Sequence, residues 1–220
     1  MNTPTPSLWI CFALDREARP LRRIIADMSP LRILVTGMGA RRTTECIEQA
    51  LERSQPEWVL TCGFAGGLTQ DCHHGDVLFE TDSPRLSNAL TNAKARPGRF
   101  HCAPRIAITI DEKRELASRT QADAVEMESH IIRHICAQRG IASATVRAIS
   151  DTANEGLPLD FNQLTGADEQ LSSAKLTIAI LKRPWVIPKL MKLGRHSSLA
   201  ATRLTECLFL AATRLKSPGH

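Results

Sequence analysis

The chain has 220 residues, of which 43% are hydrophobic, and a formal net charge of +5. This length suits one α/β domain with a complete core, and the chain has no run of about 18 apolar residues that would predict a membrane-spanning helix. The N-terminal stretch lacks the basic start that is typical of a signal peptide. Seven scattered cysteines indicate reduced thiols, so we expect a cytoplasmic protein.

The basic charge is concentrated at the C-terminal end. Eight lysines and arginines and one glutamate follow residue 181, so this segment carries +7 and residues 1–181 carry −2. A nucleic-acid-binding core would carry its basic residues on the folded domain. We therefore expect no nucleic-acid partner.

Apolar runs alternate with amphipathic segments along most of the chain. Strands are expected at residues 8–13, 31–36, 58–62, 76–80, 105–110, 122–125 and 142–149, and helices at residues 15–27, 41–53, 128–139 and 171–181. The polar residues 82–101 are expected to form a loop. This order predicts an α/β fold, a three-layer α/β/α sandwich with a central mixed sheet.

The last segment differs in character from the rest. We predict an α/β domain over residues 1–183 and a basic, amphipathic helical extension over residues 184–220. Apolar stripes with a basic opposite face can pack on the domain, on a partner or on an acidic membrane surface. The extension therefore predicts either ordinary docked helices or peripheral contact with the inner face of the membrane.

Two glycine-rich segments follow expected strands. Gly37 and Gly39, with Arg41 and Arg42 behind them, form either a phosphate-binding loop or a simple tight turn, and they lack the dinucleotide fingerprint. The second segment, residues 63–67, reads GFAGG. Its small residues leave the backbone uncovered, which would let a flat ligand approach closely, although a crowded turn would use the same residues.

Acidic residues also gather around the expected strand ends. Ser150 and Asp151 end one strand, Glu126 and Glu128 flank Met127, and the first strand is followed closely by Glu17. Strand ends at the carboxyl edge of an α/β sheet hold ligands, so these acids predict acid–base chemistry on a small polar substrate.

Each acid also has a purely structural alternative. Glu126 could pair with Arg147, Asp151 could cap a helix that starts near residue 152, and Glu17 could be a solvated helix residue. Cys72, His73 and His74 are adjacent and point in different directions, so we expect no metal there.

Together the motifs resemble one family. ALDREA (13–18), VTGMGA (35–40), TCGFAGGL (61–68), GDVL (75–78), AVEME (124–128) and VRAISD (146–151) occur in the order found in nucleoside phosphorylases and nucleosidases. They are most similar to the bacterial methylthioadenosine/S-adenosylhomocysteine nucleosidases, over roughly residues 8–181.

The resemblance implies cleavage of the bond between ribose and a purine of an adenosine-type nucleoside. It implies that Asp151 is the general acid for the base, that Ser150 positions it, and that Glu17 orients the attacking water. Asp151 would then need a dry pocket that keeps its carboxyl neutral.

The remaining roles follow from the same resemblance. Glu128 would hold the ribose hydroxyls with Met127 against the sugar, and Ala65 and Gly66 would lie around the base. It also implies a homodimer or larger homo-oligomer and no cofactor, with phosphate as a co-substrate if the reaction is a phosphorolysis.

The chain also departs from the family pattern. Phe64 replaces the usual serine of the glycine-rich loop, and the span between Asp76 and Ala124 is much shorter than in the nucleosidases. A related branch, the hopanoid-associated phosphorylases that release adenine from adenosylhopane, is similar in its acidic motif and in a tail resembling PWVIPKLMKL. A substrate with a large apolar 5′ group, such as adenosylhopane, is therefore the specific expectation, and a nonenzymatic nucleoside-binding or membrane-docking protein is the alternative from another class.

Overall fold

The computed structural model describes residues 8–25, 31–164 and 173–216, and within them eight strands form one sheet. The strands are β1 (Leu8–Phe12), β2 (Leu31–Val35), β3 (Trp58–Gly67), β4 (Val77–Thr81), β5 (Arg96–Pro97), β6 (Phe100–Cys102), β7 (Ala124–Glu126) and β8 (Ala142–Asp151). The order across the sheet is β2-β1-β3-β8-β4-β5, and β7 pairs with β3 and with β6. The four strands β2, β1, β3 and β8 are parallel, whereas β4 runs antiparallel to β8. The predicted mixed sheet is confirmed.

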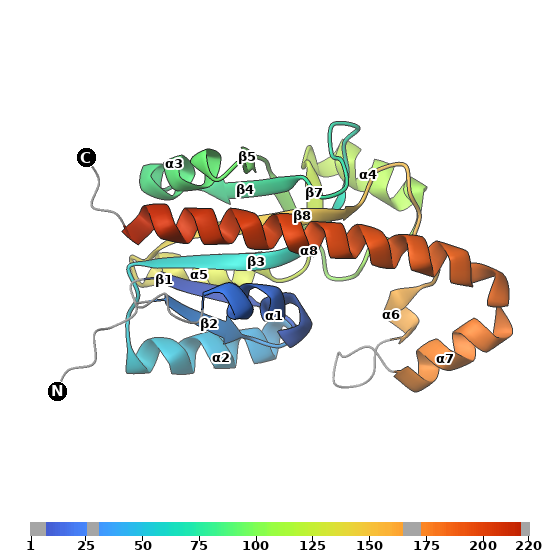
Figure 1. The fold of residues 1–220 in the computed structure, drawn as a ribbon, viewed down its shortest axis with the longest axis horizontal. Helices are drawn as coiled ribbons and strands as arrows, with labels where there is room; N and C mark the ends of the chain where they lie inside the picture. Colours follow the sequence, from blue (N-terminus) through green and yellow to red (C-terminus); the bar gives the residue numbers. More distant parts are fainter. Residues whose placement is uncertain (1–7, 26–30, 165–172, 217–220) are drawn as a thin grey trace.

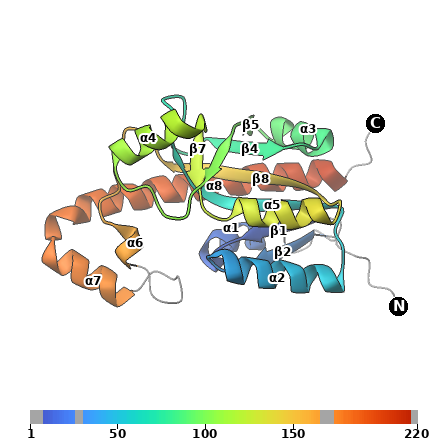
Figure 2. The same cartoon turned by 180° about the vertical axis from the view of Figure 1, so that it is seen from behind.

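Helices cover both faces of this sheet (Figures 1 and 2). Helices α1 (Asp15–Ile24), α3 (Pro84–Asn92) and α8 (Ile187–Lys216) lie on one face, and α2 (Ala40–Arg53) and α5 (Ser129–Gln138) lie on the other. Strand β1 is buried along its whole length, since both of its faces are covered. This explains why the central strands are continuous apolar runs without alternation. The predicted three-layer α/β/α sandwich is therefore confirmed.

Two sequence predictions in the middle of the chain are wrong. Residues 82–101 contain α3, β5 and β6 in place of a loop, and residues 105–110 lead into helix α4 (Ile110–Thr120) in place of a strand. Helix α3 begins with Ser83 capping the Leu86 N–H and with proline at its first position. Helix α4 begins with a capping box between Thr109 and Glu112. Both starts follow known helix signals, and local capping outweighed the weak apolar pattern on which the predictions relied.

The first predicted helix ends at Ile24, and residues 26 and 27, which the prediction included, lie outside the described residues. The predicted helix over residues 171–181 corresponds to α7 (Ser173–Lys182), and its first two residues lie outside the described part. A short helix, α6 (Phe161–Leu164), precedes it, and the turn η1 (Pro184–Val186) connects α7 to α8.

Helix α8 has two unlike halves. Its C-terminal half, from Ala200 to Leu215, buries one apolar face in the main core against β3, β4 and β8. Its N-terminal half and the preceding turn expose large apolar side chains, including Trp185, Ile187 and Met191. A boundary at residues 183/184 therefore does not separate the helix from the α/β core, because packing places half of α8 within that core. Among the described residues, no helix combines the length and apolar content needed to cross a bilayer.

Candidate active site

Parallel strands β3 and β8 bring the glycine-rich segment and the serine–aspartate pair to the same edge of the sheet. Their register pairs Ala65 with Ile149 and Gly66 with Asp151, with an irregularity between Ala65 and Gly66. A Cβ atom on Gly66 would lie 3.0 Å from Asp151 Oδ2. Glycine therefore accommodates the close approach of the carboxylate, which a side chain at this position would crowd.

The Asp151 carboxylate is held by two side chains. Ser150 Oγ donates to Oδ1 at 2.7 Å, and Lys113 Nζ donates to Oδ2 at 2.5 Å. Lys113 lies on α4, is fully buried, and also donates to the carbonyl oxygens of Thr152 and Glu155. The dry pocket that the resemblance implies for Asp151 therefore also contains a cation, the Lys113 ammonium. No helix begins near residue 152, so the capping alternative for Asp151 is excluded.

Glu126 forms a second buried ion pair, with Arg147 of β8. Arg147 Nη2 lies 2.7 Å from Glu126 Oε2, and the side chains are 3% and 1% exposed. Glu126 also accepts hydrogen bonds from the backbone N–H and the hydroxyl of Ser129. Burial opposes ionisation of Glu126, but Arg147 and Ser129 outweigh it and hold the pKa of its carboxyl below the usual range. The structural alternative for Glu126 is therefore the observed one.

Glu17 reaches the same strand edge from α1. A Cβ atom on Gly63 would lie 3.7 Å from Glu17 Oε2 and 3.9 Å from Arg147 Nε. Burial raises the pKa of the Glu17 carboxyl, against the hydrogen bond from the Leu14 N–H and the charge of Arg147. A carboxylate with a raised pKa is a better proton acceptor, which suits a group that activates water.

Met127 and Glu128 directly follow Glu126 in the chain, and both are half-buried. Glu128 caps α5, its N–H donates to Glu126 Oε2, and its charge acts on Arg147. Glu17 approaches β3 at Gly63, and Asp151 approaches it at Gly66. These two glycines are three residues apart, or about 10 Å along a strand. Glu17, Glu128 and Asp151 therefore gather along one strand end, on a scale that suits a nucleoside.

The other small residues of β3 shape this edge. Ala65 is buried, and its carbonyl oxygen accepts a hydrogen bond from Ser150 Oγ at 3.4 Å. Phe64 is partly buried and packs against the main core. Its ring therefore contributes to packing at a position where the family pattern has a hydroxyl.

The possible phosphate residues lie at the start of α2. Gly37 and Gly39 have positive φ angles of 81° and 84°, and Gly39 caps the helix. Arg41 is exposed and pairs with Glu45, whereas Arg42 and Gly37 line a cavity of about 580 Å³ beside β2. The geometry is compatible with a tight turn, and Arg32 and Arg53 line the same cavity as Arg42.

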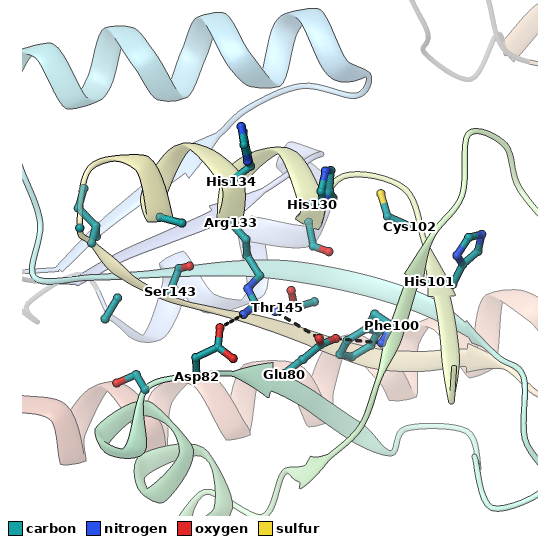
Figure 3. A pocket seen from close by; sticks show the side chains of 16 residues that line it. Glu80, Asp82, Phe100, His101, Cys102, His130, Arg133, His134, Ser143 and Thr145 are labelled. Carbon is teal, nitrogen blue, oxygen red and sulfur yellow. Dashed lines mark hydrogen bonds and ion pairs between the residues drawn. The ribbon is translucent and has the colours of Figure 1, made fainter. Parts of the chain in front are cut away.

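A larger cavity, of about 860 Å³, lies between α5, β4, β6 and the first half of β8 (Figure 3). Arg133 points from α5 to Asp82 and Glu80, and Glu80 also accepts the Phe100 N–H. None of the site residues expected from the sequence lines this cavity. Its charged groups already pair with one another, so we place the candidate site at the β3–β8 edge, where parallel strands end.

The family model of the Phosphorylase superfamily matches residues 82–182, which include β7, β8, Lys113 and Asp151. Over this part of its length the chain is similar to the phosphorylase superfamily. A 5′-methylthioadenosine/S-adenosylhomocysteine nucleosidase of Shewanella halifaxensis is 24% identical over 189 residues, covering 69% of this chain and 81% of the relative. A namesake from Haemophilus ducreyi is 22% identical and covers 77% of this chain and 94% of its own.

Solved structures share the fold. A nucleosidase of the same name from Colwellia psychrerythraea, in complex with adenine, has a TM-score of 0.72 at 15% identity and covers 98% of both chains. Futalosine hydrolase of Helicobacter pylori has a TM-score of 0.69 at 15% identity, covering 94% of this chain and 97% of its own. At this identity the likeness concerns the fold alone.

Lys113 is the site residue that reasoning from the sequence missed. It lies in the segment DEKRELASR, whose alternating charges look like a solvated helix surface. The capping box at Thr109 and Glu112 would have placed a helix there. Only the tertiary packing of α4 shows that this one lysine points inward.

Proposed function

We propose that the protein cleaves the N-ribosidic bond of an adenosine-type purine nucleoside and releases the base. The observation that carries this proposal is the gathering of Glu17, Glu128 and Asp151 along the glycine-rich end of β3. Relatives named as nucleosidases support it. A protein that only binds nucleosides would have no use for a buried proton donor beside the base.

Departure of the base needs a proton, because the C1′–N9 electron pair moves onto the purine as the bond breaks. In our proposal Asp151 delivers this proton to N7, and Lys113 replaces it from its ammonium group, which already contacts Asp151 Oδ2. Ser150 holds the other carboxylate oxygen and fixes the orientation of Asp151. General acid catalysis of this kind contributes about 10²–10⁴-fold to rate.

The sugar side uses the other two acids. Glu128 accepts hydrogen bonds from the ribose hydroxyls and stabilises positive charge that grows on the ring in an oxocarbenium-like transition state. Glu17 takes a proton from water as the water oxygen bonds to C1′. Met127 packs against the ribose, while Ala65 and Gly66 leave room for the purine.

Water is the nucleophile that we favour, because Glu17 reaches the site and Arg41 is turned to solvent. The alternative is phosphorolysis, in which Arg42, Gly37 and Gly39 hold phosphate and no other cofactor is needed. Adenosine, methylthioadenosine and a 5′-alkyl adenosine, each with and without phosphate, would distinguish these reactions when free adenine is followed. Dependence on phosphate would exclude water as the main nucleophile.

We further propose a large apolar 5′ group, with adenosylhopane as the specific candidate and methylthioadenosine or S-adenosylhomocysteine as the alternatives. Lys192 pairs with Glu155, four residues after Asp151, so the exposed apolar part of α8 lies beside the site. This surface, with Trp185, Ile187 and Met191, could receive an apolar chain or rest on an acidic membrane. The protein would then act in the cytoplasm at the inner face of the membrane.

Flotation with vesicles that contain acidic lipids tests the membrane contact. The triple variant Trp185→Ser, Ile187→Ser, Met191→Ser should lose flotation while still releasing adenine from methylthioadenosine. Equal flotation of the variant and the wild type would count against the contact. A homodimer or larger assembly is part of the same proposal and is tested by sedimentation.

The second candidate function is nucleoside binding without catalysis. The Lys113–Asp151 ion pair favours this candidate if it only stabilises the packing of α4 on β8, because the site would then have no proton donor for the base. Tight binding of nucleosides with no release of adenine from any of the three substrates would support it.

A further inference from the structure

Three potential metal ligands meet beside the candidate active site, although they are distant in the sequence. His74 lies in the loop before β4, Glu155 follows β8, and His196 lies on α8. One ligand atom from each lies within 4.8 Å of the other two. His74 Nε2 is 2.5 Å from a Glu155 carboxylate oxygen, and the His74 and His196 rings are 3.6 Å apart between centroids.

We propose that His74, Glu155 and His196 bind a zinc ion. Two imidazole nitrogens and one carboxylate oxygen are a known zinc set, and they leave a fourth position for water. Tetrahedral ligands at about 2.1 Å from zinc lie about 3.4 Å from one another. The three side chains therefore need to move by about 1 Å, which a rotation about their outer bonds supplies.

The backbone around the three ligands is already fixed in place. Gly75 has a φ of 84°, and a Cβ atom there would lie 3.1 Å from Leu199 Cγ, so glycine lets the His74 loop approach α8 closely. Its N–H donates to the Ile149 carbonyl oxygen. On the other side, Lys113 donates to the Glu155 carbonyl oxygen. Contacts with β8 and α4 therefore hold the loops in place. Because folding already orders the ligands, zinc binding loses little further conformational entropy.

The chemistry of the three side chains suits a cation, because a carboxylate oxygen and two imidazole nitrogens offer lone pairs to a metal. His74 and Glu155 are about one quarter exposed, at 24% and 27%, which gives the ion a route of entry.

One cation competes with the metal. Lys192 Nζ lies 2.8 Å from Glu155 Oε1, and its own side chain is 64% exposed. Because it is so exposed, Lys192 can turn into solvent when zinc arrives. Zinc would then join α8 to the loop that follows Asp151, which neither the proposed hydrolysis nor the family fold requires.

The test uses the full chain, freed of metal by a chelator and kept reduced. Zinc is titrated in competition with a chromophoric chelator at pH 7.5, and we expect one zinc per chain. His74→Ala and His196→Ala should each weaken binding by about 100-fold or more, since even outer partners of metal ligands change affinity by about 10–100-fold. His73→Ala is the matched control: this neighbour is 76% exposed, pairs with Asp76, and lies outside the cluster.

A second variant predicts a change of the opposite sign. Lys192→Gln removes the competing ammonium and should tighten zinc binding, whereas every ligand variant weakens it. With zinc at 100 times its Kd, the Tm of the wild type should rise by about 5–10 °C, and that of His196→Ala should not. Circular dichroism of the metal-free variants checks that they fold, and His196→Gln replaces His196→Ala if the latter does not.

Cobalt distinguishes this site from the seven cysteines. The cobalt-loaded protein should show a tetrahedral spectrum without thiolate-to-metal charge transfer. Thiolate bands would overturn the assignment, as would equal zinc affinity of the wild type and His196→Ala, or an equal loss in His73→Ala.

Discussion

Two buried ion pairs lie close together along β8, and they differ in what surrounds them. In the Arg147–Glu126 pair both side chains are at most 3% exposed. Arg147 also donates to the backbone and hydroxyl oxygens of Thr61, and Glu126 accepts from Ser129. In the Lys113–Asp151 pair the lysine is 1% exposed, but the aspartate is 11% exposed and faces Gly66.

The difference separates a structural pair from a reactive one. A guanidinium holds its proton at every relevant pH and fixes geometry through several donors, whereas an ammonium is a compact charge that can release a proton. The Arg147–Glu126 pair, with its donors and acceptors engaged inside the protein, links β8 to β3 and β7. The pair with an accessible carboxylate oxygen can exchange a proton with a ligand.

Breaking the structural pair should have the largest effect on stability. Arg147→Met leaves Glu126 charged and buried without its partner, so we expect the free energy of unfolding to fall by about 3–5 kcal/mol. Urea unfolding measures it. Arg133→Met is the control, since its partners Asp82 and Glu80 are 99% and 40% exposed, and we expect a loss of at most about 1 kcal/mol. Similar losses in both variants would contradict a special role for Arg147.

Removing the lysine of the other pair should mainly change catalysis. In Lys113→Met the ammonium that would return a proton to Asp151 is absent. The rate of adenine release should therefore fall by about 10²-fold.

The control for this prediction is Arg114→Met, on an exposed neighbour in the same helix that pairs with Asp111. Its rate of adenine release should match that of the wild type. A rate of Lys113→Met within a few-fold of the wild type would contradict the role of Lys113 as a proton source.

Some strands and site residues could be predicted from the sequence, and others could not. Strands β1, β3 and β8 could be predicted because burial on both faces requires continuous apolar runs. Asp151, Ser150 and Glu126 could be located because they follow such runs directly. By contrast, Lys113 reaches the candidate active site from α4, and the proposed zinc ligands His196 and Glu155 come from α8 and a loop. The local sequences of all three resemble solvated segments. Only packing decides which of several neighbouring charges points inward.

Helix α8 makes the same point for the fold. Its basic residues and apolar stripe predict a peripheral extension, yet Ala200, Leu204 and Leu208 are buried in the core. The amphipathic pattern identifies an apolar face, but it does not identify the surface that this face covers.

The smallest predicted effect concerns the start of α4, which carries Lys113 into the site. Hydrogen bonds from the Thr109 N–H and from Arg105 lower the pKa of Glu112 to about 2. Its folded pKa lies below its unfolded value, so the stability it contributes is present above pH ~4.5 and is lost as the pH falls toward ~2.

Glu112→Gln should cost about 1 kcal/mol at pH 7 and less as the pH falls through this window. Thermal unfolding at pH 7 and pH 3 measures both values. Asp111→Asn, on an adjacent side chain that is 92% exposed, is the control and should show no such pH dependence. A constant difference between Glu112→Gln and the wild type at both pH values would contradict the assignment.

The account rests most directly on Asp151. Release of adenine by the wild type and by Asp151→Asn, measured on the best substrate of the panel, tests whether this side chain protonates the base. We predict a loss of about 10²–10⁴-fold in kcat for Asp151→Asn, with the unfolding midpoint still showing a folded protein. Turnover by Asp151→Asn within a few-fold of the wild type would contradict the proposed reaction.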